Sequence, residues 1–163
     1  MSKRKFIKYD EIHPLLPTPE KQLIALNPST KKAWLRALRS GDYKQGKAAL
    51  RALIGEGPNN GECFCCLGVY ADVVEPKAWK APRYGGKCYT WHEAEGAFPV
   101  KWTKQQAAVF MQETKNYGTS VRPTDGVAWT LMKANDGIMA VTGRDEIKPA
   151  TFEQIALWIE RYL

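Results

Sequence analysis

TFEQIALWIERYL, residues 151–163, carries the clearest structural signal in the chain. Thr151 and Gln154 form the spacing of a capping box, in which each side chain bonds the backbone N–H of the other residue at a helix start. Apolar residues then recur at the three- and four-residue spacing of a helix face: Phe152, Ile155, Ala156 and Ile159. We predict a helix to Leu163 whose apolar face packs on the rest of the domain.

A second helix is predicted over residues 29–39, where Ser29 is the expected N-cap and Gly41 the expected stop. Its core face carries three apolar residues: Trp34, Leu35 and Leu38. Thr103 opens a third predicted helix, which runs to Lys115. Asp125 is the expected cap of a fourth, which runs to Ala134 and ends in the Asn135–Gly137 turn.

Strand signals are weaker and lie between these helices. Residues 43–53 fit a strand or a continued helix, and the apolar run 63–74 fits a buried strand or a buried helix equally well. Residues 55–61 are a predicted loop, and residues 87–92 are the best strand candidate in an aromatic-rich segment, 75–102. These patterns predict an α+β fold, with several helices around a small antiparallel sheet.

The length of 163 residues predicts a single compact domain. Residues 1–28 contain four prolines and are expected to form an extended N-terminal arm. The globular domain is then 29–163, with an aromatic-rich segment at residues 75–102. The basic N-terminus lacks the apolar stretch of a signal peptide, and no apolar run reaches bilayer length, so we expect a cytosolic protein without a membrane partner.

Charge is unevenly distributed along the chain. Residues 1–51 hold 12 Lys and Arg against 4 Asp and Glu, whereas residues 52–163 hold 12 against 13. Clustered positive charge attracts anions, so the first third favours an anionic small molecule, a nucleic acid or an acidic protein as partner. A solvated basic surface that only aids solubility explains the same pattern.

A basic segment, YKQGKAALR (residues 43–51), combines Lys44, Lys47 and Arg51 with Gln45 and a glycine. The charges suit phosphate oxygens, the amide suits orientation, and backbone N–H groups near Gly46 add donors. It is not a Walker motif. Aromatic residues interleaved with lysine and arginine follow in residues 75–102, and we expect Tyr84 and Trp91 to stack a base or nucleotide ring.

Cysteine spacing also allows a metal site. Cys63 and Cys66 form a C-x2-C pair, and Cys88 and His92 form a C-x3-H pair farther along the chain. Two such pairs can close a tetrahedral zinc site. The alternative is that the thiols pack as small buried hydrophobic groups, since the first pair lies in an apolar run. No cofactor other than zinc is expected.

Three blocks resemble a family of small bacteriophage and prophage proteins. These are LRSGDYKQG (38–46), FCCLGV (64–69) and the pair formed by Ala134–Asp136 with the helix beginning TF at Thr151. In that family, glycine often stands where this chain has Ala48. The resemblance covers roughly residues 29–74 and 125–163, and it implies that the aromatic-rich residues 75–102 are an insertion. It also implies a virus-encoded protein acting in the cytoplasm of the host bacterium, and it supplies no activity.

No complete catalytic constellation appears in the sequence, so we expect a binding protein rather than an enzyme. The first hypothesis is a non-enzymatic phage accessory protein that binds a phosphate-bearing ligand, such as a nucleotide signal of host defence. The alternatives are a nucleic-acid-binding protein and a protein inhibitor of a host enzyme that uses the aromatic segment. The oligomeric state is left open.

Overall fold

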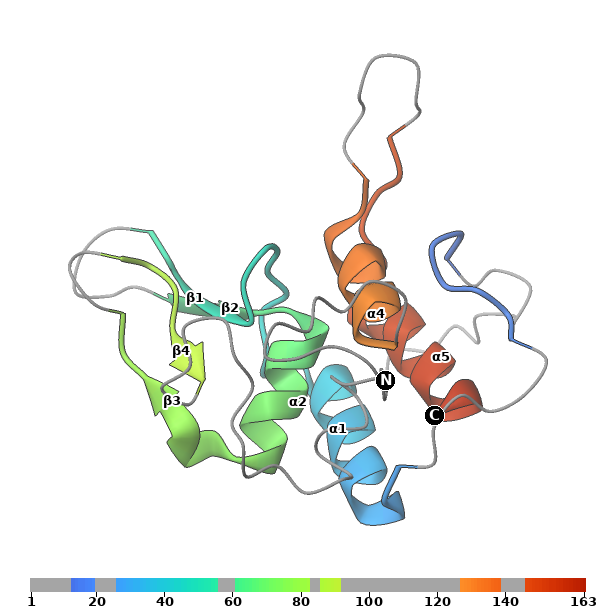
Figure 1. Ribbon diagram of the computed structural model, residues 1–163, viewed down its shortest axis with the longest axis horizontal. Helices are drawn as coiled ribbons and strands as arrows, with labels where there is room; N and C mark the ends of the chain where they lie inside the picture. The colour runs from blue at the N-terminus through green and yellow to red at the C-terminus, as the bar shows by residue number, and fades with distance from the viewer. Residues whose placement is uncertain (1–12, 20–25, 56–60, 83–85, 92–126, 139–145) are drawn as a thin grey trace, which may run out of the picture.

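The computed structural model describes residues 13–19, 26–55, 61–82, 86–91, 127–138 and 146–163. Over these residues the fold is α+β, as predicted, with helices and two small antiparallel sheets. Helix α2 (Cys66–Val74) lies between the strands on one side and the remaining helices on the other (Figure 1). Some predictions fall outside the described residues. These are the helix beginning at Thr103, the helix cap at Asp125, and the site residues Tyr84 and His92.

Helix α1 (Pro28–Ser40) begins earlier than predicted. Its N-cap is Asn27, not Ser29: the Asn27 side chain accepts hydrogen bonds from the backbone N–H groups of Ser29 and Thr30. Pro28 occupies the first turn, where its missing N–H costs nothing. The stop is as predicted, because Gly41 adopts the left-handed conformation with φ 84°.

The ambiguous run 63–74 contains both a strand and a helix. Strand β2 (Gly61–Phe64) ends where Cys65 turns the chain, and α2 follows at once. The Cys65 Sγ accepts the N–H of Gly68 at 3.4 Å and so caps the helix. A Cβ at Gly68 would lie 1.7 Å from the Leu50 carbonyl oxygen, so this close approach of helix and chain requires glycine.

Strand β1 (Arg51–Ile54) pairs antiparallel with β2, with Arg51 opposite Phe64 and Ala52 opposite Cys63. Bridges extend this sheet on both sides, through Gln45 to Phe64 and through Cys88 to Ala52. The predicted strand 87–92 is shorter in the structure, where β4 (Thr90–Trp91) pairs with β3 (Trp79–Lys80) after the short 3-10 helix η2 (Pro76–Ala78). The described part of the aromatic segment therefore forms a second small sheet, which is linked to the first by the bridge between Cys88 and Ala52.

Helices α4 (Val127–Asp136) and α5 (Phe152–Tyr162) complete the core with α1 and α2. The Thr151–Gln154 capping box is present as predicted. Fully buried side chains come from all four helices: Trp34, Tyr70, Leu131, Ile155, Trp158 and Ile159. No helix of the described residues is long and apolar enough to cross a membrane.

Part of the predicted N-terminal arm packs on the domain. Leu16 is 4% exposed and Leu26 is 8% exposed, so both belong to the core. The Leu26 N–H donates to the Leu163 carbonyl oxygen at 3.3 Å. Residues of the predicted arm therefore contribute to the core at both Leu16 and Leu26.

Ala48 is strained, because it adopts a positive φ of 61° without being glycine. Left-handed backbone costs an L-residue about 1–2 kcal/mol, and glycine loses about 0.5–1 kcal/mol of that gain through chain entropy. We predict that Ala48→Gly raises the free energy of unfolding by about 0.5 kcal/mol in urea denaturation. Ala52→Gly, in β1, is the control and should lower it; a loss of stability in both variants would contradict the strain.

Candidate functional site

A polar hub, formed by the buried Asn135 with the partly exposed Gln45 and Asp136, joins segments that are far apart in the sequence. Asn135 is 0% exposed. Its Oδ1 accepts the N–H of Cys66 (3.1 Å) and the amide Nε2–H of Gln45 (3.3 Å). Its Nδ2 donates to the Gly46 carbonyl oxygen (2.8 Å) and to Asp136 Oδ1 (2.9 Å). Asn135 therefore uses both ends of its amide to hold the start of α2 against residues 45–46.

Gln45 completes this hub on the side of α5. Its Nε2 also donates to the Ala150 carbonyl oxygen at 2.7 Å, and its Oε1 accepts the N–H of Phe152 at 3.1 Å. The Phe152 N–H lies in the first turn of α5, where no intrahelical acceptor exists. Gln45, predicted as a ligand contact, thus bonds within the chain through both atoms of its amide.

The basic segment is fixed over residues 44–48, which we call the anchored loop. The Lys44 carbonyl oxygen accepts the N–H of Phe64 (2.9 Å), and the Gly46 N–H donates to the Phe64 carbonyl oxygen (2.8 Å). The Ala48 N–H donates to both carboxylate oxygens of Asp136 at 3.3 Å. The Gly46 N–H, which we expected to face a phosphate, is therefore already used inside the fold.

Lys44 and Lys47 lie at the surface of the anchored loop and are exposed. Their charges are displayed on backbone that is bonded to β2 and to Asp136 on α4. Of the four residues predicted to contact a ligand in this segment, these two present free surface, whereas Gln45 faces the hub.

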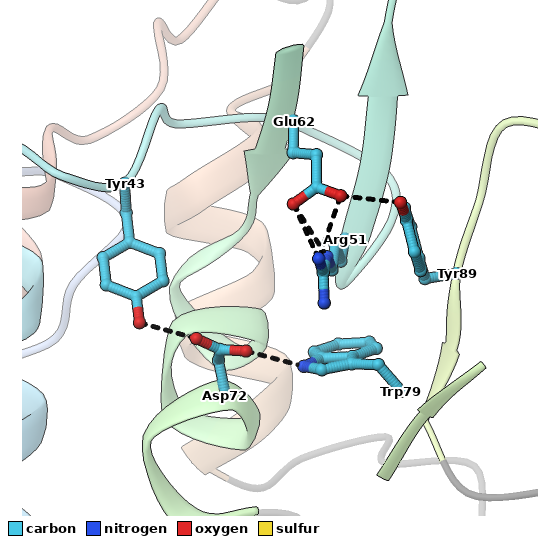
Figure 2. Close-up of polar contacts among 6 residues, drawn as sticks. All are labelled: Tyr43, Arg51, Glu62, Asp72, Trp79 and Tyr89. Atoms are coloured by element: carbon cyan, nitrogen blue, oxygen red, sulfur yellow. Dashed lines mark hydrogen bonds and ion pairs between the residues drawn. The ribbon is translucent and has the colours of Figure 1, made fainter. Parts of the chain in front are cut away.

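Arg51 is the fourth residue of the basic segment that was predicted to contact a ligand. It lies in an aromatic cluster on one face of the sheet (Figure 2). Its guanidinium forms a two-pronged ion pair with Glu62, with N–O distances of 2.7–3.1 Å. Its central carbon lies 4.2 Å from the ring centre of Tyr89, 5.2 Å from that of Phe64 and 5.4 Å from that of Trp79. This arrangement satisfies the charge within the protein.

Further hydrogen bonds orient the side chains of this cluster. The Tyr89 hydroxyl donates to Glu62 Oε1 at 2.6 Å. The carboxylate of Asp72, on α2, accepts the Trp79 indole N–H (2.8 Å) and the Tyr43 hydroxyl (2.6 Å), as Figure 2 shows. The cluster therefore ties the sheet to α2, and Arg51 acts as a structural cation in it.

Electrostatics in the cluster follow from these contacts. Burial raises the pKa of Tyr43 to about 12, with a further contribution from its bond to Asp72. The bond to Glu62 raises the pKa of Tyr89. Burial opposes ionisation of Glu62, but its bonds to Tyr89 and Arg51 outweigh that effect and lower its pKa. At neutral pH the carboxylate is charged and the phenols are protonated.

Alkaline pH should destabilise the fold. Burial raises the pKa of Cys65 from 9.0 to about 11, and that of Tyr70, like Tyr43, from 10.0 to about 12. The unfolded chain releases these protons first, so stability is intact below about pH 9 and falls as pH rises through these folded values. We predict a urea midpoint that declines between pH 9 and 12, and a smaller decline near pH 9–11 in Cys65→Ala. An unchanged midpoint to pH 11 would contradict the burial of these groups.

The predicted stacking residues are only partly within the described structure. Trp91 lies in β4, opposite Trp79, and Tyr84 falls outside the described residues. Stacking of these two residues on a ligand ring therefore stays a prediction.

The predicted zinc ligands are spread over several elements. Cys63 and Cys88 both align with Ala52, from strands on either side of β1. Cys66 is 0% exposed and its Sγ lies 3.6 Å from the Leu131 carbonyl oxygen, while burial raises its pKa well above the usual value. Within the described ranges, no three potential metal ligands gather. His92 lies outside them, so the zinc site also stays a prediction.

Sequence reasoning missed several residues that organise this region: Asn135, Asp136, Glu62, Asp72 and Tyr89. Asn135 had been assigned to a turn, and the carboxylates had no local partner to mark them. One signal could have been used, the alternation of side chains between the two faces of a strand. If the hairpin is assumed, Glu62 and Phe64 lie on the same face as Arg51 and Leu53 of the paired strand.

A family model matches residues 26–163, under the description Domain of unknown function (DUF8296). The chain belongs to this family. The DUF8296 match includes residues 75–102, which the sequence had suggested as an insertion, and it begins after most of the N-terminal arm. Neither a curated protein nor a solved structure matches the chain.

The geometry gives a structural role to the sequence blocks KQG, FCCLGV and Asn135–Asp136. KQG supplies Gln45, FCCLGV supplies Cys66, and the asparagine–aspartate pair supplies Asn135 and Asp136. The phenylalanine that leads α5 supplies the N–H of Phe152. These motif residues meet in the hub, so in this DUF8296 domain they hold the fold together.

Proposed function

We propose that this DUF8296 protein is a non-enzymatic binding protein for a phosphate-bearing anionic ligand, with Lys44 and Lys47 as its charged contacts. The observation that carries the proposal is their exposure on the anchored loop. A loop that is already bonded to Phe64 and Asp136 loses little conformational freedom when a ligand arrives, so more of the interaction energy appears as affinity.

Two further features support binding over catalysis. Cys65 and Cys66 are buried with raised pKa values, which makes them weak nucleophiles at neutral pH. Arg51 is held by Glu62 and three aromatic rings, so it fixes the sheet beside the anchored loop. In this proposal, Arg51 therefore positions the sheet beside the anchored loop.

The resemblance to phage proteins supplies the biological setting of the proposal. A phage accessory protein in the cytoplasm of its host bacterium would act by sequestering a nucleotide signal of host defence. Phosphates give such a signal the negative charge that Lys44 and Lys47 suit.

A double charge reversal tests the site. Each lost lysine–phosphate contact should weaken binding about tenfold, or about 1.4 kcal/mol. We predict that mono-, di- or cyclic nucleotides raise the melting temperature of the wild-type protein and that Lys44→Glu/Lys47→Glu abolishes this stabilisation. Lys77→Glu/Lys80→Glu changes the net charge equally at two other exposed lysines and should keep it. Equal losses in the two variants would show that general charge, not this site, attracts the ligand.

Nucleic-acid binding is the alternative function, and the same protein samples can distinguish it from nucleotide binding. Lys32 and Arg36 are exposed one turn apart on α1 and add positive charge to the first third of the chain. A nucleic-acid-binding protein would shift any duplex, and its affinity would fall steeply with salt as counterions are released. A nucleotide-binding protein should show neither behaviour.

A further inference from the structure

Residues 13–19, HPLLPTP, form a strap that is bonded to the domain at two points. His13 Nδ1 accepts the N–H of Leu15 at 3.3 Å, so Nε2 carries the proton and donates to the Lys148 carbonyl oxygen at 2.5 Å. The Trp158 indole N–H, on α5, donates to the Pro17 carbonyl oxygen at 2.6 Å. Between these points Leu16 is buried in the core.

The strap lies outside the segment that the family model matches, whereas its partners lie inside it. The DUF8296 match begins at residue 26, and both Lys148 and Trp158 belong to it. The surface on α5 therefore lies within the matched segment, and the strap that occupies it lies before that segment.

The contacts have the character of peptide recognition. Pro14 and Pro17 are exposed, residues 14–15 form a turn closed by the Leu16 N–H, which donates to the His13 carbonyl oxygen at 2.8 Å, and Leu16 is buried in the core. The domain buries the Leu16 and His13 side chains, contacts Leu15, donates the Trp158 indole N–H to the Pro17 carbonyl oxygen and accepts the His13 ring N–H at the Lys148 carbonyl oxygen. Apolar anchors combined with bonds to the peptide backbone are the usual elements of peptide recognition.

We propose that α5 carries a peptide-binding surface and that residues 13–19 fill it in cis. Trp158 is the specificity contact, because its buried indole N–H has the Pro17 carbonyl oxygen as its acceptor. Leu16 is the anchor. This inference is independent of the anchored loop and of any phosphate ligand.

The test uses the full chain and a fluorescent peptide of residues 13–19. Leu16→Asp should expel the chain's own strap and expose the surface, and Leu16→Ala should weaken the strap with less disturbance. Circular dichroism checks that each variant is folded. We expect the peptide to bind each folded variant at least tenfold more tightly than the wild-type protein, whose surface is filled.

Specificity is tested in the same background. Leu16→Ala/Trp158→Phe removes the indole donor and should weaken peptide binding at least fivefold relative to Leu16→Ala alone. A peptide with Leu16 replaced by aspartate should not bind. The proposal is overturned if folded Leu16→Ala binds no peptide, or if the wild-type protein binds it equally well, since the strap would then not occupy the binding surface.

Discussion

Asn135→Ala should lower the free energy of unfolding by about 3–4 kcal/mol, one of the largest effects that a single substitution can have in this chain. Asn135 is fully buried and makes four hydrogen bonds, to residues 45, 46, 66 and 136. Alanine leaves the buried N–H of Cys66 and the carbonyl of Gly46 without these partners, and each unsatisfied buried group costs about 1–3 kcal/mol.

Urea denaturation measures this loss, with Thr130→Ala on the same helix as the control, expected to lie within about 0.5 kcal/mol of the wild-type protein. Asn135→Asp separates the two sides of the amide. It keeps the acceptor but removes the donor and places a second carboxylate beside Asp136, so it should cost at least as much as alanine. If Asn135→Ala matched Thr130→Ala, the hub would not hold these segments together.

Arg51→Met should lower the free energy of unfolding by about 2–3 kcal/mol. The variant removes a two-pronged ion pair whose side chains are 19% and 31% exposed, together with the cation's contacts to Tyr89, Phe64 and Trp79. It also leaves Glu62 half-buried with the Tyr89 hydroxyl as its remaining donor in the cluster (Figure 2).

Arg39→Met is a matched control, because it makes the same chemical change in a more exposed pair. Arg39 is 27% exposed and pairs with Glu153 and Glu160, whose side chains are 48% and 47% exposed. Exposed pairs contribute about 0–1 kcal/mol. A double-mutant cycle of Arg51→Met with Glu62→Gln isolates the coupling. Equal losses at positions 51 and 39, with no coupling to Glu62, would contradict the structural role of Arg51.

Local signals explain what the sequence predicted well. The capping box at Thr151 and the left-handed Gly41 depend on neighbours three or four residues away, so both helix ends could be read without the fold. The predicted N-cap of α1, Ser29, was wrong, and the reason is also local. Pro28 was assigned to the arm, although proline is common in the first turn of a helix and asparagine is common just before it.

Tertiary contacts explain what the sequence could not predict. Gln45 has the composition of a ligand contact, and only the packing of α4 and α5 shows that its amide is used internally. Arg51 meets Glu62 because of the register of a hairpin, and the register is not visible in an apolar run of uncertain type. Lys44 and Lys47 differ from Gln45 and Arg51, because both lysines are exposed. Their role as ligand contacts stays a prediction.

The most direct test of the proposed function is the mass of the intact wild-type protein under native conditions, after purification from cells, compared with its denatured mass. The account predicts extra mass that matches a phosphate-bearing small molecule, and its loss in Lys44→Glu/Lys47→Glu but not in Lys77→Glu/Lys80→Glu. A wild-type protein without bound mass, even after nucleotides are added at high concentration, would contradict it.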